Sequence, residues 1–176
     1  LANGMTPANR CVNFCNAPQG PQAKRSVTEI MDKIETNRLI ANADGIATAA
    51  QILRDGGLVA FPTETVYGLG ADACNGRAVA GVFAAKGRPA FNPLIVHVAD
   101  LEMAQRFGVL SNAALSLVEK DWPEALTIVV PLRDGTGLSD LVTAGQDSLA
   151  IRVPRSDIAL ELLRAFGGPV AAPSAN

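Results

Sequence analysis

Apolar residues follow two rhythms along this chain, and the two rhythms alternate from about residue 36 onward. Spacing of i, i+3, i+4 and i+7 predicts a first helix with the apolar stripe Ile46, Ala49, Ala50 and Leu53. Asp44 is placed to cap the start of this helix, and the two glycines at 56–57 would end it. The continuous apolar run at 58–61 then predicts a short buried strand.

The alternation continues to the end of the chain. Asn75 and Ser111 are expected to cap two further helices, and another apolar stripe predicts a helix at 156–166. More strands are predicted at residues 94–98, 126–132, 148–153 and 169–172. Helices that alternate with short strands, many of them apolar on both faces, indicate an α/β fold with a parallel or mixed sheet.

Residues 1–25 do not share this pattern. They contain four Asn and three Pro, no acidic residue and no apolar periodicity, which is typical of a disordered tail. We therefore expect residues 1–35 to be a leader, disordered or foreign to the natural protein, and residues 36–176 to be the folded domain. Met31 is a candidate natural start.

Composition narrows the class of protein. The chain has 176 residues, 48% of them hydrophobic, and a net charge of −2, which argues against wholesale disorder and against a strongly basic nucleic-acid coat protein. No apolar run is long enough to predict a membrane-spanning helix. One His and three Cys exclude a multi-histidine zinc site and a disulfide scaffold, and the odd thiol count favours a reducing, cytoplasmic setting.

Two glycine-rich or basic motifs suggest nucleotide chemistry. The run at 68–73 matches G-x-G-x-x-A, but it is separated from the preceding strand and lacks the acidic residue expected further on, so we reject a dinucleotide site. Lys86 and Arg88 stand two apart after a predicted helix, where a rigid loop could present them to a polyphosphate. Two solvated cations that stabilise a helix C-terminus would have the same spacing.

Polar runs follow two predicted strands: residues 62–68, whose hydroxyls and carboxylate could hold a small polar substrate, and the small residues at 173–176. Ligands of α/β proteins bind at the carboxyl ends of strands, so both runs are candidates for a ligand site, although either could be an ordinary turn. His97 lies on a predicted strand and could be a ligand contact or a core histidine. No nucleophile motif accompanies it, so a catalytic triad is weakly supported.

Taken in order, five segments closely resemble the YrdC-like domain of the threonylcarbamoyl-AMP synthase family. They are residues 61–70 (FPTETVYGLG), 86–89 (KGRP), 92–97 (NPLIVH), 150–154 (AIRVP) and 172–176 (APSAN). The resemblance covers about residues 42–176. It implies a twisted mixed sheet, parallel and antiparallel, that is flanked by helices around a large ligand cavity, and a catalytic domain truncated at its C-terminal side.

The resemblance also implies an activity, that of an L-threonylcarbamoyladenylate synthase. This nucleotidyltransferase would use L-threonine, bicarbonate and ATP with its Mg²⁺, without a prosthetic group or a resident metal. Its product would pass to a downstream threonylcarbamoyl transferase and tRNA, with no membrane involved. Two alternatives remain open: a YrdC-like module that binds double-stranded RNA or tRNA, and a YrdC paralogue without synthase activity.

Site residues follow from the same motifs. The resemblance implies that threonine is bound by Thr65, His97, Arg152 and the backbone at Ala172. It implies that ATP is bound by Lys86, Arg88, Asn92, Ser148, Ser174 and Asn176, with Lys86 and Arg88 supplying the catalytic cations. The chain departs from the family pattern where Glu124 and Ala125 replace a usual Gly-Pro. A carboxylate near anionic ligands would weaken their binding.

Overall fold

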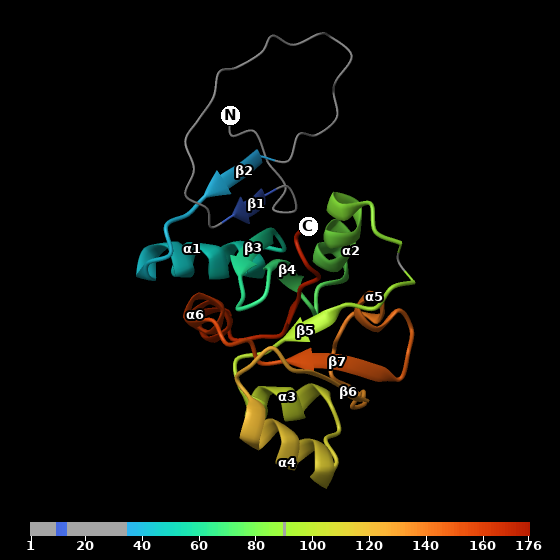
Figure 1. Cartoon of the computed structure of the whole chain (residues 1–176). Helices are drawn as coiled ribbons and strands as arrows, with labels where there is room; N and C mark the ends of the chain where they lie inside the picture. The colour runs from blue at the N-terminus through green and yellow to red at the C-terminus, as the bar shows by residue number, and fades with distance from the viewer. Residues whose placement is uncertain (1–9, 14–34, 90) are drawn as a thin grey trace, which may run out of the picture.

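A single mixed sheet organises the computed structural model, which describes residues 10–13, 35–89 and 91–176 (Figure 1). The strand order is β2-β1-β3-β4-β8-β5-β7-β6. The strands are β1 (Arg10–Asn13), β2 (Glu35–Arg38), β3 (Leu58–Pro62), β4 (Tyr67–Asp72), β5 (Ile95–His97), β6 (Thr127–Pro131), β7 (Ser148–Arg152) and β8 (Val170–Ala171). β1 pairs in parallel with β2 and β3, and β5 with β7, whereas the other neighbours are antiparallel. The predicted mixed α/β sheet is confirmed.

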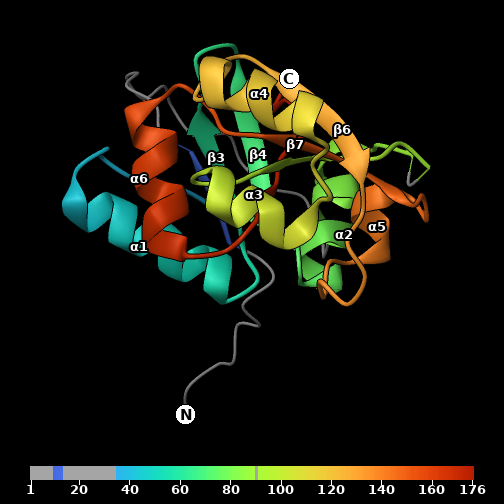
Figure 2. The ribbon, with the colours of Figure 1, turned by 90° about the horizontal axis from the view of Figure 1, so that it is seen from below.

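Helices cover both faces of the sheet. They are α1 (Ala43–Arg54), α2 (Gly76–Lys86), α3 (Leu101–Phe107), α4 (Asn112–Asp121), α5 (Asp140–Thr143) and α6 (Asp157–Phe166). Helices α1 and α6 pack together on one face, and their apolar stripes meet Val59, Phe61 and Val170 of the sheet. Helices α2 to α5 pack against the opposite side of the strands, around Val96 and Ile151. Figure 2 shows α1 beside α6, with α3 and α4 together as a second group.

Polar caps fix the helix starts, mostly as the sequence predicts. Asn75 caps α2 and Ser111 caps α4, each accepting backbone N–H groups of the first turn. The predicted cap of α1 is wrong: Asn42 is the cap, and its Oδ1 accepts the N–H of Gly45 at 2.9 Å. Asp44 lies inside the first turn instead, where its charge favours the positive end of the helix dipole.

The predicted leader contributes to the sheet. Arg10–Asn13 form β1 between β2 and β3, and Glu35 begins β2. The remainder of residues 1–34, including Met31, lies outside the described residues. The domain boundary at residue 36 stays a prediction. Within the described residues, no helix is long and apolar enough to cross a membrane.

Candidate functional site

Two buried polar residues lie side by side at the carboxyl ends of adjacent strands. His97 ends β5, Arg152 ends β7, and the parallel register pairs their Cα atoms directly. Because side chains alternate along strands, paired residues point to the same face of the sheet. His97 is 4% exposed and Arg152 is 9% exposed. The strands therefore hold an imidazole and a guanidinium together, although both groups are costly to bury.

The Arg152 guanidinium is held by the loop that follows β3. Its Nη2 donates to Oε1 of Glu64, which forms an ion pair, and to Oγ1 of Thr65 at 3.2 Å. Burial lowers the pKa of Arg152 from its ordinary value, since desolvation penalises the charged form. A guanidinium titrates so high that it remains charged. Its Nε is buried and has no hydrogen-bond partner among the described residues.

His97 is an uncharged imidazole at neutral pH. Burial lowers its pKa from 6.5 to about 4, a shift that a hydrogen bond with the backbone of Ile95 opposes. The ring packs edge-on against Phe61, with the ring centroids 5.9 Å apart. Its Nδ1 is buried and unpartnered within the described part of the chain. A neutral imidazole with one open nitrogen can hydrogen-bond a polar ligand but is a weak proton acceptor at neutral pH.

Lys86 and Arg88 lie where α2 ends. Gly87 between them adopts the left-handed conformation (φ 58°) that ends the helix, which a glycine does without steric cost. Nζ of Lys86 donates to the backbone carbonyl of Asn176, and Nη2 of Arg88 donates to the carbonyl of Pro93 at 3.3 Å. Nε of Arg88 is also buried without a partner in the described chain.

The C-terminal segment joins these two places. The N–H of Ala172 donates to the carbonyl of Ile95 at 2.9 Å, and Ser174 forms an antiparallel bridge with Gly68 of β4. The segment then reaches the end of α2, where Asn176 accepts the bond from Lys86 (Figure 1). The structure thus brings the 172–176 and 86–89 motifs together, as the resemblance implies.

Asn92 and Ser148 stand apart from the other predicted site residues. Within the described residues, no side-chain hydrogen bond joins either of them to the rest of the set. Ser148 begins β7 on the same face as Arg152, about 13 Å away at the usual rise of a strand. That face is open at β6 and β7, since Val129 is 70% exposed and Ala150 half-buried. An open stretch of sheet therefore leads from Arg152 to Ser148.

Sequence reasoning did not predict that Glu64 pairs with Arg152, or what lies next to that pair. Oε2 of Glu64 accepts the backbone N–H of Arg155 at 2.9 Å, and the Arg155 guanidinium forms an ion pair with Glu124. The N–H of Glu124 also donates to the carbonyl of Val153 at 3.2 Å. The carboxylate that we expected to act on anionic ligands is thus compensated by a cation. The sequence marks Glu64 by its place in a polar run after a buried strand and in the FPTETVYGLG motif, and neither signal identifies its partner.

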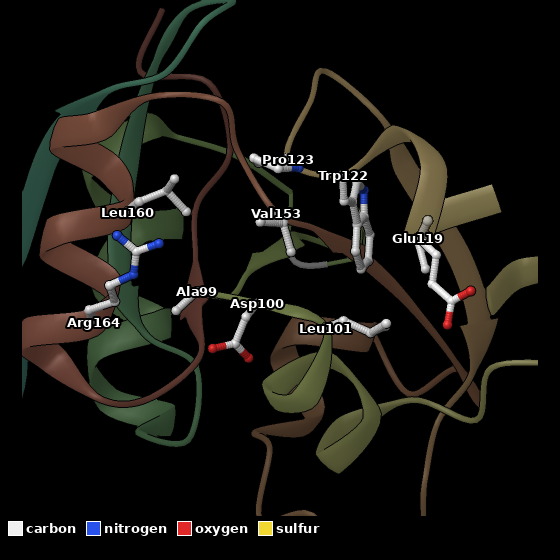
Figure 3. Close-up of a pocket in the computed structure, with 10 residues that line it drawn as sticks. Ala99, Asp100, Leu101, Glu119, Trp122, Pro123, Val153, Leu160 and Arg164 are labelled. Atoms are coloured by element: carbon white, nitrogen blue, oxygen red, sulfur yellow. The ribbon is translucent and has the colours of Figure 1, made fainter. Parts of the chain in front are cut away.

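A separate pocket of about 330 Å³ lies between α3, α4 and α6 (Figure 3). Its lining is mainly apolar and comprises Ala99, Asp100, Leu101, Val118, Glu119, Trp122, Pro123, Val153, Leu160 and Arg164. Figure 3 shows the Trp122 ring on one side and the Arg164 side chain on the other. No residue predicted to bind threonine or ATP lines this pocket. Its link to them along the chain is Val153, which directly follows Arg152.

Comparison with known proteins identifies related sequences. A family profile described as "Telomere recombination" (Sua5/YciO/YrdC) matches residues 51–176. The threonylcarbamoyl-AMP synthase of Bacillus subtilis (strain 168) is 46% identical over 156 residues, which are 88% of this chain and 43% of that protein. The threonylcarbamoyl-AMP synthase of Pyrococcus abyssi is 46% identical over 132 residues, 74% of this chain and 38% of that protein. The chain spans less than half the length of these curated relatives.

A solved structure shares the fold. Pyrococcus abyssi Sua5 complexed with L-threonine superposes with a TM-score of 0.74 at 45% sequence identity. The match covers 77% of this chain and 39% of that one.

Proposed function

Because the chain belongs to the Sua5/YciO/YrdC family, we propose that it is the catalytic domain of a threonylcarbamoyl-AMP synthase. This nucleotidyltransferase takes L-threonine, bicarbonate and ATP and forms threonylcarbamoyl-AMP and pyrophosphate. Relatives with that activity in their names are 46% identical to the chain. The Pyrococcus Sua5 structure of the same fold was obtained with L-threonine. Both findings support the proposal.

The main structural support for the proposal is a set of three buried nitrogen atoms without hydrogen-bond partners. Among the described residues, three buried side-chain nitrogens have no hydrogen-bond partner, and they belong to Arg88, His97 and Arg152. All three residues are among those that the motifs predict to bind threonine or ATP. A buried polar group without a partner costs about 1–3 kcal/mol, so such groups mark places that a ligand or water completes. Their coincidence with the motif residues supports one ligand site.

The threonine end of the site would be formed by Thr65, His97, Arg152 and the backbone at Ala172. Arg152 offers Nε to the threonine carboxylate, where a charge-assisted hydrogen bond is stronger than a neutral one. His97, held neutral by burial, hydrogen-bonds the substrate rather than taking its proton. Thr65, exposed beside Arg152, offers its hydroxyl oxygen.

The nucleotide end would be formed by Lys86, Arg88, Asn92, Ser148, Ser174 and Asn176. Lys86 and Arg88 bring two positive charges to one loop, and the Arg88 Nε lacks a protein partner among the described residues. ATP would enter as its Mg²⁺ complex, and the ion would help to neutralise the phosphate charge. The open sheet face between Arg152 and Ser148 gives the two substrates room to lie along one surface.

The reaction needs positioning and charge neutralisation more than a strong base. The threonine amine bonds to the carbon of CO₂ derived from bicarbonate and loses a proton, which gives a carbamate. A carbamate oxygen then attacks the α-phosphorus of ATP, and the bond to the bridging oxygen breaks as pyrophosphate leaves. Lys86 and Arg88 stabilise the negative charge that grows on the phosphates. Arg152 holds the threonine carboxylate in place.

The product, a mixed anhydride, is suited to immediate use. A downstream threonylcarbamoyl transferase would pass its acyl group to tRNA. We place both steps in the cytoplasm, in keeping with the odd number of cysteines.

Release of pyrophosphate tests the proposed function. With ATP, bicarbonate and threonine, the chain should release pyrophosphate in a threonine-dependent manner. Lys86→Ala and Arg88→Ala should each lower kcat/KM by about 10²-fold or more, since each removes a charge that acts on the transition state. Lys120→Ala, on the exposed side of α4, is the matched control and should leave the rate unchanged.

This assay, together with measurements of tRNA and ATP binding, separates the alternatives. Threonine-independent rates, or full activity in both variants, would contradict the synthase assignment. Binding of tRNA that weakens steeply with salt, without binding of ATP, would instead favour the RNA-binding module. ATP binding with no threonine requirement would favour the paralogue.

A further inference from the structure

Glu64 makes more contacts with the site than its place in a loop suggests. Its side chain is only 15% exposed, and its two carboxylate oxygens bond to different partners. Oε1 forms the ion pair with Arg152, and Oε2 accepts the backbone N–H of Arg155 at 2.9 Å. One carboxylate thus holds both a guanidinium at the end of β7 and the backbone three residues further on.

A second contact ties the same two segments. Oγ of Ser156 donates to the carbonyl of Pro62 at 3.1 Å, next to the Glu64 bonds. Inside the 62–66 loop, Oγ1 of Thr63 donates to the carbonyl of Val66 at 2.6 Å and keeps the turn closed. The loop after β3 and the segment after β7 therefore form one hydrogen-bonded unit, with Glu64 in its middle.

Glu64 also determines which part of Arg152 remains available. Nη2 of Arg152 donates to both Glu64 and Thr65, whereas its buried Nε has no partner among the described residues. Without Glu64, the mostly buried guanidinium would lose its counter-charge, and an unpaired buried charge is strongly unfavourable. The side chain would then turn toward solvent, because its long aliphatic stem allows it to move.

We propose that Glu64 is the positioning residue of the amino-acid site: it fixes the Arg152 guanidinium so that Nε faces the substrate carboxylate. This inference rests on the proposed function. Glu64 acts through Arg152 and does not touch the reacting atoms. Its loss should therefore weaken the use of threonine while the use of ATP, at the other end of the site, is preserved.

Two substitutions at Glu64 test the role. Glu64→Gln keeps the shape but replaces one acceptor oxygen with an NH₂ group, so either Arg152 or the Arg155 N–H loses its acceptor. Glu64→Asp keeps the charge but is one methylene shorter and should partly restore function. Glu124→Gln is the matched control, since it removes a carboxylate from the same network at a position whose side chain is 43% exposed.

The first readout is kinetic. Glu64→Gln should raise KM for threonine at least tenfold and leave KM for ATP within twofold, while Glu64→Asp gives an intermediate value and Glu124→Gln the wild-type value. Equal changes in both KM values, or none, would overturn the proposal. Should Glu64→Gln fail to fold, Glu64→Asp is compared with Glu124→Gln. Only Glu64→Asp should then raise KM for threonine relative to KM for ATP.

The second readout does not need activity. In ¹⁵N spectra, the Nε–H of a fixed, buried arginine exchanges slowly with water and gives a sharp resonance, which Arg152→Lys identifies by its absence. That resonance should be present in the wild type and in Glu124→Gln, and broadened or absent in Glu64→Gln. Persistence of the resonance in Glu64→Gln contradicts the positioning role. A wild type that shows the resonance but binds no threonine would instead refute the proposed function and leave the positioning intact.

Discussion

Burial changes the chemistry of His97 more than its sequence neighbours do. As a residue of the NPLIVH motif it is predicted to contact threonine, and the sequence alone leaves open whether it is a ligand contact or a core histidine. In the structure, the imidazole of His97 is buried against the ring of Phe61. Burial lowers the pKa of His97 to about 4. The two alternatives are therefore compatible, because the same side chain is packed in the core and keeps one unpartnered nitrogen.

This low pKa makes stability depend on pH. Since the pKa in the folded chain lies below the ordinary 6.5, the unfolded chain binds the proton first as the pH falls. The stabilisation is complete above about pH 6.5 and is lost as the pH falls toward 4. Between pH 8 and pH 5, the wild type should lose about 2 kcal/mol more of its free energy of unfolding than His97→Gln.

Urea denaturation at the two pH values measures this difference. His97→Gln is the reference because glutamine does not titrate, so the losses that remain in it come from other groups. Equal losses in the wild type and in His97→Gln would show that the imidazole is not buried in its neutral form.

The motifs predict which residues would form the site but not how those side chains are held in place. Lys86, Arg88 and Arg152 come directly from the family motifs, and the structure gives each a fixed environment. Glu64 lies in one of those motifs, but its partner Arg152 is 88 residues away in the chain. No local periodicity or capping rule reports such a pairing, because it depends on how β3 and β7 are placed in the sheet.

At the level of elements, segments with a clear apolar stripe or run were predictable, and segments without one were not. The apolar stripes of α1 and α6 and the runs at β3, β5, β6 and β7 correspond to the predicted elements. Helices α3 and α5 were missed, since seven and four residues are too short to show a helical period. β4 was missed because two glycines interrupt its apolar pattern.

Close packing explains a glycine inside β4. A Cβ added at Gly70 would lie 2.7 Å from Cγ1 of Val170 and 2.8 Å from Cε1 of Phe61. The missing side chain thus makes room for two core residues from the neighbouring strands, β8 and β3. The G-x-G-x-x-A match lies mostly in a central antiparallel strand and not in the strand-to-helix turn where a dinucleotide motif sits.

A pair of glycine substitutions tests this packing. Gly70→Ala should lower the free energy of unfolding by about 1–3 kcal/mol, because it overpacks the core. Gly81→Ala in α2 should instead raise it by about 0.5–1 kcal/mol, since the added Cβ has an ordinary contact, 3.6 Å from Leu58, and alanine favours helix. Chemical denaturation of both variants measures whether the free energy of unfolding falls in Gly70→Ala and rises in Gly81→Ala. A neutral Gly70→Ala would contradict the close contacts.

At the level of the whole molecule, the sheet extends beyond the region that the family profile covers. Residues 51–176 contain β3 to β8, whereas β1 and β2 precede them and continue the sheet past β3. Composition predicted no structure for residues 1–25. The sequence did not reveal β1, because this strand has only four residues and pairs with β3, which is far away in the chain. Without β1, the strand edge of β3 would be uncovered.

Removal of residues 1–34 tests what β1 contributes. The shortened chain should keep its fold and lose about 5 °C in Tm, the change expected for ~2 kcal/mol in a domain of this size. It should also associate at high concentration, because an uncovered apolar strand edge invites pairing with another chain. Thermal unfolding and sedimentation measure the two effects. An unchanged Tm would show that residues 1–34 do not contribute to the stability of the fold, as expected of a leader.

The pocket between α3, α4 and α6 has a practical consequence. Trp122, the one tryptophan of the sequence, forms a wall of this pocket, and its Nε1 donates to the carbonyl of Leu126 at 2.8 Å. Two residues further on, Glu124 pairs with Arg155, whose backbone N–H bonds to Glu64. Indole fluorescence therefore comes from Trp122 alone. Trp122 is connected to the Arg152 guanidinium along the chain to Glu124, and then through the contacts of Glu124 with Arg155, Arg155 with Glu64, and Glu64 with Arg152. The chain carries its own optical probe of that connection, and no label needs to be attached.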